Sequence, residues 1–437
     1  MTDKIVAIDL GTSHLTGIVG EKQSDGKFSI VAYDTEDPYS SIRRGNIYNL
    51  DDMAVHIKKL ISRLENKLRG GRIEKIYVGV GGQSLRTIEH AESKDIDGVV
   101  TESDVNVLKN RCETYIPDLL DVLDIAPPVF YLDGRRELKP EGVACKRLEA
   151  RYKLIVGRPS IRRDLLNTIR ERGQKDVEII VSPLSLADAM LSKEEKELGC
   201  ALVDFGAGVT TVAIYKNDEL LNLSVLPMGS NLITKDLTSL QITETEAEKL
   251  KREHGSATVC KEDDGEKVKI DRDNGPKEIE LNDLNAIIEG RIMEIIENVV
   301  ARIREVIEPR SLGQGIVLAG CAADLKNLPE LLKDKYRMGV RFSAIRGGLV
   351  NGADDLTGNP LYMTAVSIML KGTEQCVNMP FVTPESDSDP VSVTPINTRD
   401  EEEKERRKRE KEAERIRKKE KRANNLRRMI GGLFEDN

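Results

Sequence analysis

Two short stretches, one in each half of the chain, repeat the same order of residue types. Each is an apolar run followed by an aspartate and then by glycine and hydroxyl residues, and the aspartates are Asp9 and Asp204. Such an apolar run is typical of a buried strand, and the glycines let backbone N–H groups of a tight turn approach a ligand. An aspartate repels phosphate but can hold a hydrated Mg²⁺ that bridges to phosphate oxygens. The repeat therefore predicts two lobes that close on one Mg-nucleotide, although either copy alone would be an ordinary turn.

The composition excludes several classes of protein. The 437 residues are 39% hydrophobic and 32% charged, with a net charge of −8, no Trp and only 4% aromatic residues. Few aromatic side chains and a negative charge argue against nucleic-acid binding. Six scattered cysteines without a CxxC pair, together with four histidines, predict a reduced, cytosolic protein rather than a disulfide or zinc framework. We expect neither a signal peptide nor a membrane-spanning helix.

Hydrophobic periodicity places the main elements. It predicts helices over 51–68 and 281–307, and strands that end in glycine turns over 75–82 and 315–320. The polar stretch 261–276 is expected to be a hairpin or loop. Beyond residue 372 the folded pattern stops: 384–395 is rich in Ser, Asp and Pro, and 399–422 consists almost entirely of Glu, Lys and Arg. These stretches predict a disordered, charged linker.

A short amphipathic pattern follows this linker. Its five apolar residues fall on one helical face, with two arginines on the flank: Leu426, Met429, Ile430, Leu433 and Phe434, with Arg427 and Arg428. A helix of this kind beside basic residues binds anionic membrane surfaces. The pattern alone favours a membrane-binding helix no more than the alternative, which is a frayed terminus or a partner-binding peptide.

Several stretches together resemble the FtsA family of bacterial division proteins, within the actin and heat-shock-chaperone ATPase superfamily. The motifs are two phosphate loops, two connecting helices and the start of an adenosine loop: 9–13 and 204–208, 182–187 and 359–365, and 318–320. Two further stretches narrow the resemblance to FtsA. Residues 133–155 resemble its inserted subdomain, and 247–251 its adenosine-contacting helix.

The resemblance implies an α/β, two-lobed actin-like ATPase fold with a nucleotide cleft and a charged, disordered tail that ends in an amphipathic helix. The expected boundaries follow the order of the family's subdomains: 1–82 and 157–197 for subdomain 1A, 83–156 for the inserted 1C, 198–256 and 309–375 for 2A, 257–308 for 2B, 376–423 for the linker and 424–437 for the membrane-targeting segment.

It also implies roles for individual residues around ATP and Mg²⁺. Asp9 and Asp204 would orient the hydrated metal. The expected phosphate ligands are Gly11, Thr12 and Ser13 in the first loop and Gly206, Gly208, Thr210 and Thr211 in the second. The expected nucleoside neighbours are Gly229, Glu248, Lys251 and Gly320. By spacing alone, Glu248 and Lys251 would equally form a surface ion pair. No dedicated base is evident, and His14 is expected to be incidental, so at most slow hydrolysis is implied.

Three departures from the family pattern bear on this site. Cys321, Ala322 and Ala323 follow Gly320 where glycines are usual, so side chains are expected to crowd the purine. Ser230 takes the second place of a glycine pair that begins at Gly229, and Ser367 stands where the second connecting helix commonly has a glycine.

The partners implied by the resemblance are the C-terminal peptide of FtsZ on subdomain 2B, further copies of the chain in a polymer, the anionic membrane and later division proteins. On 2B the docking face is expected around Glu289, Arg291 and Glu294. The implied location is peripheral, on the cytoplasmic face of the inner membrane at the division site. The alternatives are a PilM-like nucleotide-binding platform of a pilus machine, and a cytosolic kinase or chaperone ATPase.

Overall fold

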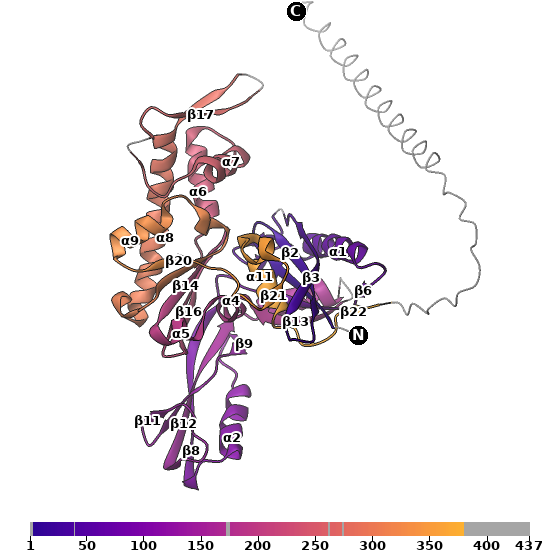
Figure 1. Cartoon of the computed structure of the whole chain (residues 1–437), viewed down its shortest axis with the longest axis vertical. Coiled ribbons are helices and arrows are strands. Elements are labelled where there is room, and N and C mark those ends of the chain that lie inside the picture. Colours follow the sequence, from indigo (N-terminus) through magenta and orange to yellow (C-terminus); the bar gives the residue numbers. More distant parts are fainter. Residues whose placement is uncertain (1–2, 39, 172–174, 261–262, 273–274, 380–437) are drawn as a thin grey trace, which may run out of the picture. The chain divides into compact units, whose positions relative to one another are not determined.

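The computed structural model describes residues 3–38, 40–171, 175–260, 263–272 and 275–379, and residues 1–380 form one compact unit. Its body has two lobes, each built on a β-sheet (Figure 1). None of the helices in these ranges has the length and the apolar run that crossing a bilayer requires. Residues 380–437 lie outside the described residues, and they include the amphipathic segment with the residues 426–434 assigned to the membrane. The linker predicted over 376–423 begins too early, because Val377 and Asn378 form a short strand paired with residues 72–73.

Lobe one contains a six-stranded sheet, and Asp9 lies near the carboxyl end of one of its central strands. The strand order is β13 (Asp176–Val181), β7 (Lys75–Val80), β1 (Lys4–Leu10), β2 (Leu15–Lys22), β3 (Phe28–Glu36) and β21 (Val350–Asn351). Strands β1, β7 and β13 are parallel, with Asp9 opposite Gly79. Their carboxyl ends therefore meet at one edge, where α/β sheets bind ligands.

Helices pack on both faces of this sheet. Helix α1 (Leu50–Lys67) packs on β2 and β3, and α11 (Pro360–Met369) packs on β1, β2 and β7. Asn49 caps α1 by accepting from the backbone N–H groups of Asp51 and Asp52. The remaining short elements of this lobe are β4 (Ile42–Arg43), β5 (Asn46–Ile47), β6 (Arg72–Ile73), α3 (Ser160–Leu166), α10 (Asp354–Thr357) and β22 (Val377–Asn378).

The inserted subdomain is dominated by two long antiparallel strands, β8 (Arg86–Val99) and β12 (Ala144–Gly157). Their inner face packs against α2 (Glu102–Glu113) in a separate core around Leu108, Leu148 and Leu154. Strands β9 (Asp121–Ile125), β10 (Val129–Leu132) and β11 (Arg135–Glu137) complete it. Figure 1 shows β8 and β12 extending away from the strands of lobe two.

The strands of the inserted subdomain and those of lobe two form one ten-stranded sheet, because β8 pairs with β16 at one position. Its own strands are β14 (Cys200–Phe205), β15 (Thr210–Lys216), β16 (Glu219–Leu226), β19 (Gly315–Ala319) and β20 (Val340–Phe342). Alternate residues face opposite sides. Leu202 and Ala213 join the core of lobe one, whereas Val203 and Val212 join the core beneath α8.

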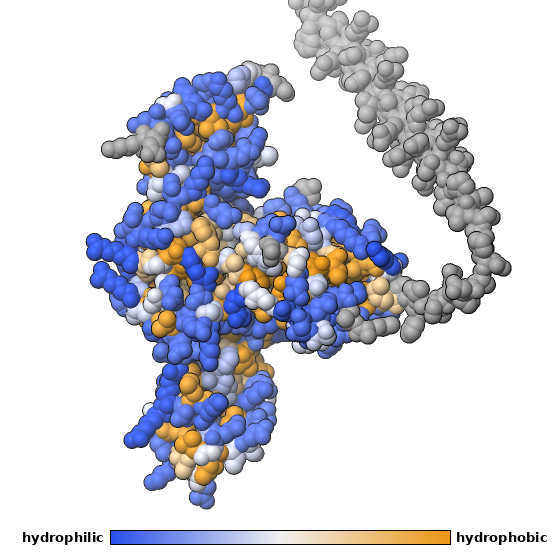
Figure 2. Space-filling model, in the orientation of Figure 1, coloured by the Kyte–Doolittle hydropathy of each residue, from blue (hydrophilic) through white to orange (hydrophobic). Residues whose placement is uncertain are grey.

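Helix α4 (Ser182–Met190) and α5 (Lys193–Leu198) carry the chain from the first lobe to the second. The helical part of lobe two consists of α6 (Ser230–Leu237), α7 (Glu244–His254), α8 (Leu281–Val306) and α9 (Leu328–Tyr336), with the hairpin β17 (Lys267–Ile270) and β18 (Lys277–Glu280). The bounds of α8 agree with the helix expected over 281–307. Hydrophilic residues cover most of the face shown in Figure 2.

One segment lies elsewhere than the sequence suggested. Residues 309–375 were expected in lobe two, but β21 pairs with β3, α11 packs on β1, and β22 pairs with β6. The chain returns to lobe one between β20 and β21. The physical reason is long-range pairing, such as that of Val350 with Phe28, which hydrophobic periodicity does not reveal.

Candidate nucleotide site

The two aspartates occupy equivalent places in the two lobes. Asp9 pairs across its hairpin with Thr16, and Asp204 pairs in the same way with Thr211. Burial and the charge of Asp204 raise the pKa of Asp9 to about 7. Burial raises the pKa of Asp204 to about 6. A cation between these carboxylates would favour their ionised forms.

This pair suits a magnesium ion that keeps most of its water. Among the described residues, no group of three or more His, Cys, Asp or Glu side chains could hold a metal ion. Two carboxylates fall short of a full protein cage, but Mg²⁺ is usually bound by one or two carboxylates together with waters and phosphates. The residues present therefore fit the expected metal.

The structure brings the two glycine loops into contact. A Cβ placed on Gly208 would lie 2.7 Å from Oγ1 of Thr12, so only a glycine lets the second loop lie this close to the first. The Gly206 N–H donates to the Val209 carbonyl at 3.0 Å, which closes the second turn. Gly11 approaches the His14 carbonyl in the first turn. The loops expected to face one another therefore do so.

Two threonines of the second loop are buried. The Thr210 hydroxyl donates to the Met228 carbonyl at 2.8 Å, and the Thr210 residue is fully buried. Thr211 lies opposite Asp204 and is 5% exposed. Thr210 therefore joins β15 to the segment that leads into α6, whereas Ser13 in the first loop is exposed.

Gly229 fixes the second loop against the start of α6. Its backbone is extended, and a Cβ on it would lie 2.4 Å from the Ala207 carbonyl oxygen. The N–H groups of Ser230 and Asn231 donate to the carbonyls of Gly206 and Ala207 at 3.0 and 2.9 Å. Gly229 thus permits a close backbone contact that any side chain would prevent.

Glu248 and Lys251 form a partly buried hydrogen-bond network rather than an ordinary surface pair. Their charged groups are 2.6 Å apart, and the Lys251 side chain is only 8% exposed. Nζ of Lys251 also donates to Oγ1 of Thr234 at 2.9 Å and to the Ser230 carbonyl at 3.3 Å. Thr234 donates to the same Glu248 oxygen at 2.6 Å.

The ionisation of this pair follows from its surroundings. Burial lowers the pKa of Lys251, and the Glu248 charge opposes that shift. The pKa of Glu248 is also lowered: burial acts against the shift, but the charge and hydrogen bonds of Lys251 outweigh it. A Glu248 carboxylate that is held in this way and left 41% exposed can accept hydrogen bonds from a ligand.

Gly320 brings the adenosine loop against the second phosphate loop. Its φ is +86°, and a Cβ on it would lie 2.6 Å from Oδ1 of Asp204. Of the three residues that follow, Ala323 is buried and Ala322 packs on the lobe-two core, so Cys321 alone is exposed. Desolvation and nearby Asp204 raise the pKa of the Cys321 thiol to about 11, so it is protonated at neutral pH.

Comparisons with known proteins decide the family. The family model described as "Cell division protein FtsA" matches residues 201–367. The FtsA of Porphyromonas gingivalis is 33% identical over 85% of this chain and 78% of its own length. The chain belongs to the FtsA family. The FtsA of Bacillus subtilis is 30% identical over 83% of this chain and 82% of its own length.

A solved structure supports the fold. The PilM–PilN type IV pilus biogenesis complex contains a chain with 17% identity and a TM-score of 0.58, covering 84% of this chain and 97% of that chain. At this identity the similarity concerns the fold alone. It agrees with the actin-like, two-lobed architecture expected of an FtsA-family protein.

The two connecting helices, α4 and α11, share a contact that the sequence did not predict. Ser367, at a position where the FtsA pattern commonly has glycine, lies with its hydroxyl 2.9 Å from that of Ser185 on α4. Both residues are 1% exposed. This hydrogen bond joins α11 to α4 inside the core, and only the tertiary structure shows it.

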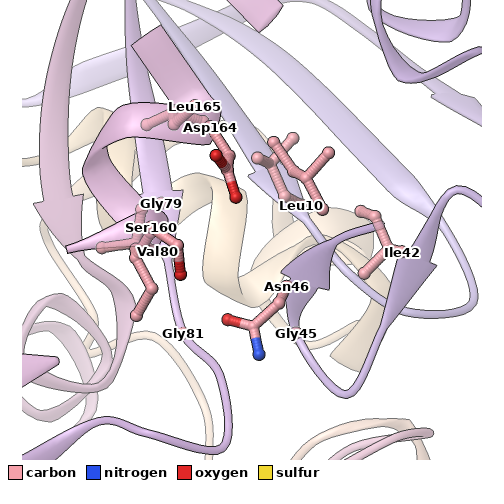
Figure 3. A pocket seen from close by; sticks show the side chains of 12 residues that line it. Leu10, Ile42, Gly45, Asn46, Gly79, Val80, Gly81, Ser160, Asp164 and Leu165 are labelled. Carbon is pink, nitrogen blue, oxygen red and sulfur yellow. The ribbon is translucent and has the colours of Figure 1, made fainter. Parts of the chain in front are cut away.

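Sequence reasoning also missed the contacts behind the first loop. The Gly45 N–H donates to Oγ1 of Thr12 at 3.2 Å, so the turn between β4 and β5 supports the loop. A pocket adjoins this turn, and the side chains of Asn46, Ser160 and Asp164 surround it (Figure 3). In the sequence, only the glycine turn predicted at 81–82 gave an indication of this pocket.

Proposed function

We propose that this FtsA-family chain is a division protein that binds Mg-ATP between its lobes, assembles on the cytoplasmic face of the inner membrane and tethers the FtsZ ring there. Membership of the FtsA family supports the role in division. The observation that carries the nucleotide site is the pair of carboxylates, Asp9 and Asp204, at the meeting point of two glycine loops.

In this site each group has a distinct task. Asp9 and Asp204 would hold a hydrated Mg²⁺, which would supply charge neutralisation at the phosphates. Backbone N–H groups of the first loop would face the β-phosphate and that of Gly208 the γ-phosphate, whereas the Gly206 N–H is already bonded to the Val209 carbonyl. Glu248, positioned by Lys251, and Gly320 adjoin the nucleoside. No side chain is assigned as a base, so we expect slow turnover, with nucleotide acting as an assembly switch.

Nucleotide binding is tested by equilibrium titration of the full chain with Mg-ATP. We expect Asp9→Ala and Asp204→Ala each to abolish binding, because each removes one of two metal-orienting carboxylates. The matched control is Asp25→Ala, at an exposed aspartate in the turn between β2 and β3. Unchanged binding in both site variants would disprove the assignment.

The groove between α6 and α8 is the proposed docking site for the FtsZ peptide. It is lined by Asp236, Ile287, Gly290 and Arg291, among others. Arg291 donates from Nε to Asp236 at 2.5 Å, which links the two helices. Of the expected docking residues, Arg291 and Glu294 line this groove.

Glu289 lies elsewhere: its carboxylate accepts from the Val259 N–H at 2.8 Å, on another side of α8. This difference supplies a matched test. Gly290 has open space where its Cβ would lie, so Gly290→Phe should fill the groove and weaken binding of a synthetic FtsZ C-terminal peptide. Glu289→Ala should leave binding unchanged. Equal affinity for both variants would place the peptide elsewhere.

The membrane role rests on the sequence pattern at 426–434. Flotation with anionic liposomes tests it, comparing the full chain with a chain truncated before Leu426, with and without ATP. Flotation of the full chain alone would support a peripheral anchor that holds the division protein and its later partners at the membrane. If neither chain floats, the tether proposal fails even where nucleotide binding succeeds.

A further inference from the structure

The inserted subdomain is joined to lobe one by more than its chain connections. It leaves lobe one after Gly82, whose φ is +135°, and returns at residues 157–159. The Arg158 N–H donates to Oγ of Ser84 at 3.2 Å, which ties the two connections together. Arg162 on α3 then donates to Asp121 of β9 at 2.7 Å. The base of the insert is therefore fixed to lobe one by side chains as well as by backbone.

The same subdomain is hydrogen-bonded to lobe two through Thr87. Oγ1 of Thr87 accepts from the Leu223 N–H at 3.1 Å and from the Asn222 side-chain amide at 3.2 Å. It also donates to the Leu223 carbonyl at 3.5 Å. One hydroxyl of the insert thus makes three contacts with strand β16. This cluster is part of no site described above.

Two further contacts surround this cluster. Arg86 of β8 pairs directly with Ser224 of β16, which is where the sheet of the insert joins that of lobe two. Arg136 of β11 donates to the Asn217 carbonyl at 3.3 Å and lies 3.5 Å from the Glu219 carboxylate. The insert therefore contacts lobe two at the start of β16 and again over residues 222–224.

In the same structure, the phosphate loops of the two lobes are in contact. Thr12 of lobe one and Gly208 of lobe two touch at the phosphate loops. To separate these loops, the lobes must rotate relative to each other. Because the insert is fixed to lobe one and hydrogen-bonded to β16, such a rotation either bends the connections at Gly82 and Gly157 or breaks the contacts of Thr87.

We propose that the inserted subdomain is a brace between the lobes, and that Thr87 is a positioning residue that holds the nucleotide cleft closed. The inference rests on the proposed binding of Mg-ATP. Loss of the Thr87 contacts lets the cleft open more readily, so bound nucleotide leaves faster. The orientation of the insert is in turn coupled to the state of the cleft.

The first test is the rate at which a fluorescent ATP analogue leaves the full chain in a chase with excess ATP. We expect Thr87→Val to speed release about fivefold, since a net hydrogen bond contributes about 1 kcal/mol. Thr87→Ser, which retains the hydroxyl, should restore slow release. Thr114→Val is the matched control, because the Thr114 hydroxyl bonds only within its own helix end.

The second test locks the brace without removing it. Directly opposite residues on antiparallel strands lie close enough for a disulfide, so the double variant Arg86→Cys with Ser224→Cys should cross-link β8 to β16. Oxidation should slow release at least tenfold, and reductant should restore the original rate. The single variants Arg86→Cys and Ser224→Cys, which retain the native cysteines including Cys321, should release nucleotide at the same rate before and after oxidation.

The outcomes separate this inference from the proposed function. If the unmodified chain binds no Mg-ATP, the proposed function fails and the brace fails with it. If it binds and both Thr87→Val and the cross-linked variant release nucleotide at the unmodified rate, only the brace is overturned. The cross-linked variant decides the matter where Thr87→Val does not fold.

Discussion

Replacing Asp9 with asparagine should stabilise the nucleotide-free protein at pH 8. The pKa of Asp9 is about 7 in the folded state and 3.8 as the reference value. The folded protein therefore binds this proton more tightly than the unfolded chain does. Its free energy of unfolding falls as the pH rises from about 4 to about 7, and it stays low above that range. An amide of the same shape carries no charge to bury.

The shift of about three pKa units corresponds to an upper bound of about 4 kcal/mol at 1.36 kcal/mol per unit. Because Asp9 is partly exposed and its titration is coupled to that of Asp204, we expect about 2 kcal/mol from Asp9→Asn. At pH 4 the gain should vanish, since the carboxyl is then largely protonated in the folded state. Added Mg-ATP should raise the melting temperature of the unmodified protein and not that of the variant.

The assay is thermal unfolding in a chelator at pH 4, 6 and 8. Asp176→Asn is the control of opposite sign, because the hydrogen bond from Arg170 lowers the pKa of Asp176. That change should leave stability the same or slightly lower at pH 8. If Asp9→Asn destabilises the protein equally at every pH, the buried charge of Asp9 does not lower the free energy of unfolding, and the reasoning is refuted.

Three further predictions follow from the same site. The affinity for Mg-ATP should rise between about pH 6 and pH 8, as measured by calorimetry, because metal binding requires both carboxylates to be ionised. Lys251→Met should lower stability by about 1 kcal/mol, since it removes the cation that is hydrogen-bonded to a Glu248 carboxylate still 41% exposed to water. Lys249→Met at an exposed position of the same helix should change little in chemical denaturation. Gly229→Ala should cost about 2 kcal/mol through a backbone clash, and Gly81→Ala, which meets open space, is the control; equal losses would contradict the close contact.

The local sequence pattern was sufficient to predict the strands, loops and helix that carry the candidate site residues. The aspartate at the end of an apolar run predicted both loops, and the stripe of isoleucines and valines predicted α8 almost to its ends. Within α1 the pattern was less reliable. Apolar Val55 is 50% exposed, whereas His56 is buried and lies 2.9 Å from the Glu36 carboxylate.

What the sequence did not reveal depends on contacts between distant residues. Spacing placed Glu248 and Lys251 on one side of a helix, but burial and Thr234 turn that pair into a network. The hydrogen bond from Gly45 to Thr12 likewise joins segments that no periodicity relates. Such contacts become visible only when the strands are assembled.

The return of the chain to lobe one has a consequence for biosynthesis. Strand β1, which is synthesised before the strands of lobe two, is covered by α11, and the Lys4 carbonyl accepts from the Cys376 N–H at 2.8 Å. On the ribosome, β1 must therefore wait until nearly the whole body has been translated before its packing is complete. The strands and helices of lobe two emerge in an almost unbroken run before that. Lobe two should thus fold first during synthesis, and the nascent first lobe is the part that needs protection from aggregation.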